Sequence, residues 1–172
     1  QSGLALVDPQ GAGFDCDLTM ALGWADLQAF WPEILLSGCI LGLLIGDLLI
    51  VHPDQKKRYL TPLALTGLLG AFALAWSLED RPMHAAFYGQ IAIDPIGTFF
   101  KLVFLVMTAV SLLASLLSKE LPAKQLGEYY ALLLSITFGM FLMCSANDLL
   151  MVFLGIEMVS IVSYALAGYR LR

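Results

Sequence analysis

Charged side chains are scarce in this sequence of 172 residues. Only 13% of the residues are Asp, Glu, Lys or Arg, whereas 59% are hydrophobic. A soluble domain carries about 45–50% apolar and about 25% charged residues, so this composition excludes an ordinary soluble domain. The mean hydropathy is +0.82, and the apolar residues come in long uninterrupted runs. These runs predict an all-α integral membrane protein and argue against a β-barrel, whose strands alternate apolar and polar residues.

The sequence also lacks the usual marks of a catalyst. Its three cysteines, Cys16, Cys39 and Cys144, are far apart and show no CxxC or Cys/His spacing. We therefore expect no metal site, and plain buried thiols at Cys39 and Cys144, which lie in or beside apolar runs. The sequence has no phosphate-binding loop, nucleophile triad or flavin motif, and no basic patch that would bind nucleic acid. We expect no cofactor and no redox centre in this chain.

Five apolar segments are long enough to cross a membrane, which takes about 20 residues. The segment of residues 1–28 is expected to lie outside the membrane, residues 29–117 to form three leading helices, and residues 127–172 to form two more. Acidic or amide side chains precede two of the helices, at Asp94-Pro95 and Asn147-Asp148, where they can cap free backbone N–H groups. The predicted helices are Ala29–Val51, Tyr59–Leu78, Pro95–Leu117, Glu128–Ser145 and Asp148–Tyr169.

Basic residues are unevenly distributed between the two sides of the predicted bundle. One side carries seven of them and the other carries only Arg81, while Lys101 lies within a helix. Because cytoplasmic loops collect Lys and Arg, we expect the N-terminus outside and the C-terminus inside. The seven residues are Lys56, Lys57, Arg58, Lys119, Lys124, Arg170 and Arg172.

Glu157 is the strongest candidate for a functional residue. It lies nine residues after Asp148, or about 13.5 Å along a helix at ~1.5 Å per residue. This places a carboxylate near the midplane of a hydrocarbon core that is about 30 Å thick. Such a residue either carries protons or is a neutral acid hydrogen-bonded to a neighbouring helix. Ser160 and Tyr164 follow at i+3 and i+7, so they are expected on the same helix face.

Other ionisable residues are secondary candidates. Lys101 lies about two turns into its helix, where it can extend to the outer interface or pair with an acid on another helix. We favour a structural role for it. Asp47 is expected to meet the headgroups or the Lys-Lys-Arg segment, whereas Glu33 and Glu128 are expected at the interface near helix N-termini.

Small residues recur at four-residue spacing along four of the helices, which predicts close packing of their backbones. The positions are Gly38, Gly42 and Gly46; Gly67, Ala71 and Ala75; Ser111 and Ser115; and Ala131, Ser135 and Gly139.

The last third of the chain resembles the subunit N family of the proton-pumping NADH:quinone oxidoreductase, respiratory complex I. Pro32-Glu33, Asp47 and Asp94 also resemble that family, and the likeness covers most of residues 30–172. The motifs that carry it are Gly127-Glu128-Tyr129-Tyr130, Gly139-Met140, Asn147-Asp148-Leu149, Phe153-Leu154-Gly155-Ile156-Glu157 and Ala167-Gly168-Tyr169-Arg170.

The resemblance implies a fold and a set of partners. Its members are related to cation/proton antiporter subunits and contain two inverted repeats of five helices. The first three helices here would be the leading helices, and the last two would start the first repeat. Glu157 would match the conserved carboxylate of that repeat. The partners would be the lipid bilayer and other membrane-arm subunits in a bacterial inner membrane. Flavin, iron–sulfur clusters and quinone would belong to other subunits.

Two alternatives remain open at the level of sequence. A subunit of a multi-subunit cation/proton antiporter or of a membrane-bound hydrogenase would share Glu157. A truncated segment that acts only as a packing scaffold would share the small-residue stripes.

Overall fold

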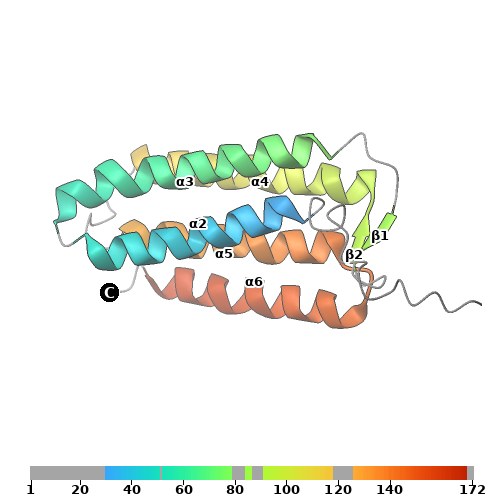
Figure 1. Ribbon diagram of the computed structural model, residues 1–172. Helices are drawn as coiled ribbons and strands as arrows, with labels where there is room; N and C mark the ends of the chain where they lie inside the picture. The colour runs from blue at the N-terminus through green and yellow to red at the C-terminus, as the bar shows by residue number, and fades with distance from the viewer. Residues whose placement is uncertain (1–29, 51, 79–83, 87–90, 118–125, 170–172) are drawn as a thin grey trace, which may run out of the picture.

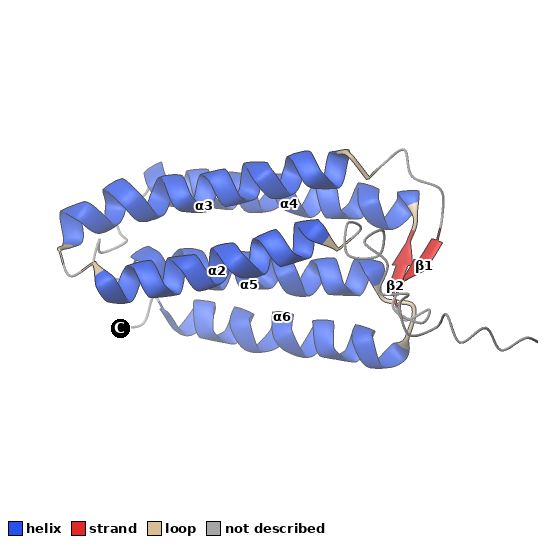
Figure 2. Cartoon of the chain, viewed as in Figure 1, coloured by secondary structure: helices blue, strands red, loops and turns tan. Residues whose placement is uncertain are grey.

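The computed structural model describes residues 30–50, 52–78, 84–86, 91–117 and 126–169, and five long helices make up almost all of these (Figure 1, Figure 2). All five are long and apolar enough to cross a membrane. The expectation of five membrane-spanning helices is therefore confirmed in length and composition. They are α2 (Trp31–Leu49), α3 (Pro53–Trp76), α4 (Pro95–Leu117), α5 (Leu126–Ser145) and α6 (Leu149–Tyr169).

The start of α4 follows the predicted capping chemistry. The carboxylate Oδ1 of Asp94 accepts a hydrogen bond from the backbone N–H of Gly97 at 3.0 Å. The Thr98 hydroxyl donates to the backbone carbonyl of Asp94 at 3.0 Å. The first of these bonds satisfies a backbone N–H that the first helical turn leaves without a partner. The predicted bounds of this helix, Pro95–Leu117, are confirmed.

The start of α3 was predicted wrongly. The helix begins at Pro53 rather than at Tyr59, so most of the expected 52–58 loop is the first part of a helix. Hydropathy detects only the apolar part of a helix, whereas a proline at the first position also favours helix in a polar segment. The backbone N–H of Lys56 already donates to the His52 carbonyl at 3.2 Å.

A short hairpin connects α3 to α4 and was not predicted. Strands β1 (His84–Ala86) and β2 (Ile91–Ile93) pair antiparallel, with Ala85 opposite Ala92. A further bridge joins Ile91 to Ala146 in the turn between α5 and α6. Strands of three residues are too short to show the period-2 pattern by which a strand is recognised.

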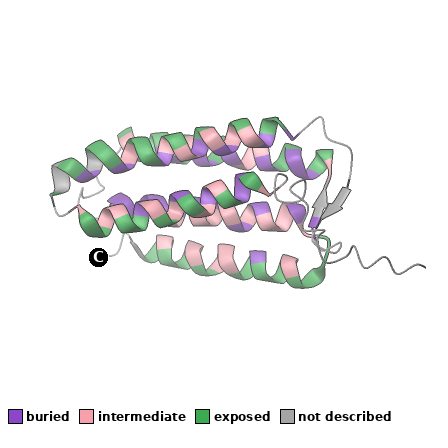
Figure 3. Ribbon diagram, viewed as in Figure 1, coloured by how far each residue is buried: buried purple, intermediate pink, exposed green. Residues whose placement is uncertain are grey.

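Helix α5 lies at the centre of the bundle. It packs against α2, α3, α4 and α6. Helix α6, in contrast, packs mainly against α5. Figure 1 shows α6 along one edge, with α2 and α5 between it and the pair α3 and α4. Accordingly, 44% of the α5 span is buried but only 6% of the α6 span (Figure 3).

The contact between α5 and α6 depends on two glycines. A Cβ atom on Gly139 would lie 2.8 Å from Cγ2 of Val159, and one on Gly155 would lie 2.5 Å from Cγ of Met143. Real carbon atoms do not approach so closely, so both positions require glycine for this spacing. The expected stripe is thus confirmed at Gly139, but at Gly38 a Cβ would meet nothing within 4 Å.

Replacing Gly139 with valine should therefore separate α5 from α6. We expect Gly139→Val to lower the free energy of unfolding by about 1–3 kcal/mol, the usual cost of overpacking. The matched control is Gly38→Val, which adds the same atoms where space is open. Thermal unfolding of both variants in detergent measures the difference, and equal melting temperatures would contradict the close contact.

Candidate functional site

Glu157 lies near the middle of α6, as its ninth residue of 21. Its side chain is exposed. Within the described residues it has no hydrogen bond or ion pair. A structural acid would be hydrogen-bonded to a neighbouring helix. Glu157 has no such partner on the other described helices.

The geometry of α6 explains why Glu157 is exposed. Successive residues of an α-helix are rotated by about 100°, so Glu157 lies about 200° around the axis from Gly155. Gly155 faces α5, and the glutamate therefore points away from it. By the same arithmetic Ser160 and Tyr164 lie about 140° and 180° from Gly155, on the same outer face.

The exposures of these neighbours agree with that placement. Tyr164 is 76% exposed, and Ser160 is half-buried. The three predicted site residues thus share one face of α6, which none of the described helices covers. We call the face formed by Glu157, Ser160 and Tyr164 the Glu157 face.

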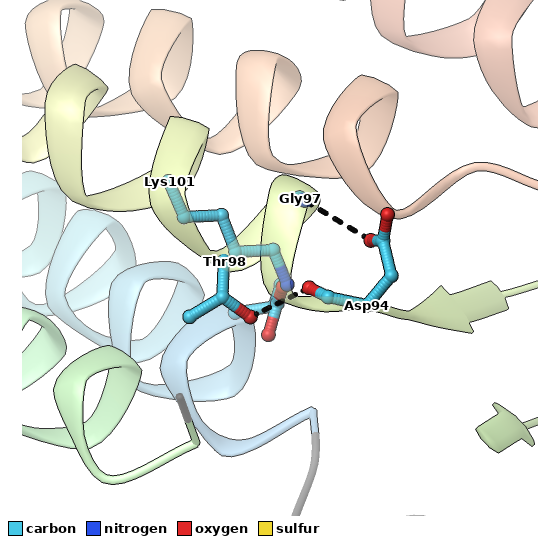
Figure 4. Close-up of polar contacts among 5 residues, drawn as sticks. Asp94, Gly97, Thr98 and Lys101 are labelled. Atoms are coloured by element: carbon cyan, nitrogen blue, oxygen red, sulfur yellow. Dashed lines mark hydrogen bonds and ion pairs between the residues drawn. The ribbon is translucent and has the colours of Figure 1, made fainter. Parts of the chain in front are cut away.

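Lys101 forms a buried ion pair with an acid on another helix. Its Nζ atom lies 2.5 Å from Oε1 of Glu33, and Figure 4 shows the lysine side chain extending along α4 toward the Asp94 end. Lys101 is 8% exposed and Glu33 is completely buried. Of the two possibilities for Lys101, pairing with an acid on another helix is the one that the structure contains.

Glu33 lies in the first turn of α2, near the helix N-terminus as expected, but its burial between helices and its pairing with Lys101 were not predicted. It is the third residue of α2 and Lys101 is the seventh of α4, and both helices start at the same end of the bundle (Figure 1). Because Glu33 and Lys101 lie within the first two turns of their predicted helices, their similar depth in the membrane was a signal for this ion pair. Sequence alone does not show that α2 and α4 approach each other, because α3 separates them in the chain.

The pair has two further features. The ammonium group of Lys101 lies 5.7 Å from the ring centroid of Phe141 on α5, within range of a cation–π interaction. The second carboxylate oxygen of Glu33, Oε2, is buried and has no hydrogen-bond partner among the described residues. The pair thus links α2, α4 and α5.

A second ion pair lies at the opposite end of the bundle. Nζ of Lys56 lies 2.8 Å from Oδ1 of Asp47, which confirms that Asp47 meets the Lys-Lys-Arg segment. A Cβ atom on Gly127 would collide with the Asp47 carboxylate. Asp47 therefore lies at the start of α5, where the positive end of the helix dipole favours an anion.

The remaining candidates have ordinary positions. Glu128 lies in the first turn of α5 and is exposed, as expected for an interfacial acid at a helix N-terminus. Among the described residues, no three His, Cys, Asp or Glu side chains are arranged to bind a metal ion. Cys39 is a buried free thiol and Cys144 a half-buried one, and Cys16 lies outside the described residues.

Removing one partner of the buried pair should destabilise the protein. Lys101→Met leaves the Glu33 carboxylate buried without a counter-charge, which typically costs about 3–5 kcal/mol. The double variant Glu33→Gln/Lys101→Met removes both charges and should recover most of that loss. Urea unfolding of the single and double variants in detergent forms a double-mutant cycle, and additive losses would show that the two side chains do not interact.

Comparison with known proteins identifies the family. The NADH-quinone oxidoreductase subunit N 2 of Chloroherpeton thalassium is 41% identical over 145 residues, which cover 83% of this chain and 28% of that protein. Subunit N of an Anaeromyxobacter species is 38% identical over 145 residues, again 83% of this chain and 28% of that protein. Subunit N 1 of Koribacter versatilis is 33% identical over 160 residues, which cover 88% of this chain and 31% of that protein.

No family model matches the chain. The chain spans 28% of the length of the first two relatives and 31% of the third, so it corresponds to a segment of such a subunit. The matched residues cover 83% to 88% of this chain. This chain, which matches a segment of such a subunit, belongs to the subunit N family of NADH-quinone oxidoreductases.

Proposed function

We propose that this chain is the leading part of a membrane-arm subunit that takes part in proton translocation coupled to quinone reduction. The observation that carries the proposal is the Glu157 face. A carboxylate lies near the middle of a membrane-spanning helix, is exposed, and has no partner within the described residues. An ionisable residue at that depth is costly in lipid, and it normally marks an ion or proton pathway.

The chemistry of such a site depends on changes in its surroundings. A carboxylate releases its proton when water or a cation stabilises the charged form, and binds one when it is desolvated. Ser160 and Tyr164 add two hydroxyl groups on the same face of α6. A proton passing along this face would find both donors and acceptors beside Glu157.

The chemistry of the Glu157 face also indicates which partners would cover it. An exposed acid is poorly suited to lipid, so further helices of the same assembly would cover this face, as in an inverted-repeat bundle. The partners would be other membrane-arm subunits of the oxidoreductase, in the cytoplasmic membrane of a bacterium. Flavin, iron–sulfur clusters and the quinone site would be held by other subunits.

The distribution of basic residues gives the proposed orientation, with the Lys56 end of the bundle inside and the Asp148 end outside. We expect Gln55→Cys, at an exposed position in the first turn of α3, to react with an impermeant maleimide only when the inner side is accessible. Asp148→Cys, at the exposed opposite end, should react from outside. Labelling of intact cells and of inverted vesicles measures both, and the reverse pattern would contradict this orientation.

The role of Glu157 can be tested in the full-length protein within its complex. We expect Glu157→Gln to assemble normally, since glutamine is nearly isosteric, but to lower coupled quinone reduction and proton translocation about tenfold or more, in the range of lost proton-transfer groups. Glu157→Asp should retain part of the activity because the titrating group survives. The measurement is quinone turnover and proton uptake in membranes, normalised to assembled complex.

The matched control is Asp148→Asn, the same acid-to-amide change at the exposed start of the same helix. It should leave turnover and proton uptake unchanged, because asparagine keeps the capping oxygen. If Glu157→Gln pumps protons at the wild-type rate and stoichiometry, Glu157 has no part in translocation. Co-purification of flavin and iron–sulfur subunits with the full-length protein tests the proposed assembly separately.

A further inference from the structure

Helix α5 contacts polar groups of the leading helices at three places: a ring beside an ammonium group, a hydroxyl pair and a glycine beside a carboxylate. The first is the Glu33–Lys101 pair, whose ammonium group lies 5.7 Å from the Phe141 ring centroid. The second is a hydrogen bond between the buried hydroxyls of Thr108 on α4 and Thr137 on α5, at 2.6 Å. The third is the Asp47–Lys56 pair, whose carboxylate lies against the start of α5.

The positions of these contacts on α5 are ordered along its length. They occur at Gly127, Thr137 and Phe141, a span of 14 residues or about 21 Å at ~1.5 Å per residue. All three lie within about 80° of one another around the helix axis at about 100° per residue. The contacts therefore form one stripe that runs along most of α5.

Helix α6 packs on the other side of α5. Gly139, which receives α6, lies about 120–160° around the axis from each of the three contact positions. The leading helices thus hold α5 on one face while α6 rests on the opposite face through the Gly139–Gly155 contact. Glu157 follows Gly155 by two residues, so its position depends on the rotation and depth of α5.

Apolar packing is a weak determinant of that rotation in a membrane. Lipid tails are as apolar as leucine, so sliding or turning a helix changes little in hydrophobic energy, and close packing and polar interhelical contacts then set the register. The contacts at Gly127, Thr137 and Phe141 are spread along α5, so together they can set both its depth and its rotation.

We propose that Glu33, Lys101, Thr108, Thr137 and Asp47 are positioning residues that fix the rotation of α5 and thereby place Glu157. We call these five residues the α5 clamp. That the clamp fixes the placement of α5 and α6 is independent of the proposed function of Glu157. Only its effect on proton translocation rests on that function. The five residues act through α5 and α6 and do not touch the translocated proton.

The first test measures helix placement directly in the full-length protein within its complex. Spin labels at two exposed positions, Val106→Cys on α4 and Ile156→Cys on α6, report the distance between the leading helices and α6. The native cysteines are replaced by serine in this background. We expect Glu33→Leu/Lys101→Met combined with Thr108→Val/Thr137→Val to broaden or shift this distance distribution.

These variants are chosen to separate positioning from stability. Replacing a buried charge pair by apolar residues of similar size is often neutral for stability, and valine matches the shape of threonine. A second label pair, Leu41→Cys on α2 and Leu69→Cys on α3, both exposed, does not involve α5 and should be unchanged. An unchanged α4–α6 distance in assembled complex would overturn the proposal.

The second test asks whether placement matters for coupling. We expect the clamp variants to assemble and to translocate fewer protons per quinone reduced, because small displacements of a reacting group lower the rate of its step. The charge-swapped pair Glu33→Lys/Lys101→Glu should restore both the distance and the ratio. If the apolar variants fail to assemble, the threonine-to-valine pair alone and the swapped pair provide the same two readouts.

The outcomes distinguish this inference from the function of Glu157. A shifted α6 with an unchanged proton ratio would overturn the positioning role while leaving Glu157→Gln to decide the function. Loss of the proton ratio in the clamp variants without any change of distance would also overturn it. If Glu157→Gln pumps normally but the distance shifts as expected, the proposed function fails and the clamp remains as a structural feature only.

Discussion

The buried ion pair between Glu33 and Lys101 is the interaction on which the arrangement of the leading helices depends. Each of these charges would cost several kcal/mol to bury alone, so neither helix can place its charge in the interior without the other. The pair therefore ties the depth of α2 to that of α4, two helices that are not consecutive in the chain. Because the ammonium group also lies over Phe141, the same interaction reaches α5.

Helix α5 carries this constraint to the candidate functional site. It is the most buried of the five helices, and it separates the leading helices from α6. Its two sides have different chemistry, with polar contacts toward α2 and α4 and a glycine contact toward α6. The polar side fixes orientation, and the glycine side brings the backbones of α5 and α6 close together. Glu157 is then held in place by backbone geometry without itself making a hydrogen bond or ion pair with the described residues.

Several local features could be predicted from the sequence because they depend on near neighbours. The bounds of α4 follow from Asp94, Pro95 and an apolar run of the right length. The pairing of Asp47 with the basic segment follows because only a short turn separates them. The β-hairpin and the early start of α3 were missed because short strands and polar helical turns leave little hydropathy pattern.

The burial of Glu33 illustrates what local patterns leave out. Proline and glutamate at the start of a helix are typical of an interfacial cap, and nothing nearby in the sequence distinguishes this glutamate from such a cap. Its partner is 68 residues away, and the pair exists only because α2 and α4 start at the same end of the bundle, where their two long side chains meet. Similarly, Gly38 and Gly139 look equivalent in sequence, yet only Gly139 has a helix packed against it.

The sequence by itself determined that the chain crosses the membrane as helices, since apolar runs of this length leave the backbone no other way to satisfy its hydrogen bonds. It also determined that Glu157, Ser160 and Tyr164 share one face, because helical periodicity sets their directions. Only the tertiary structure decided which way that face points, which charges are paired and which glycines bring helices together. These depend on the rotation and neighbours of each helix, and in an apolar solvent such choices are made by a few polar and close-packed contacts between residues distant in sequence.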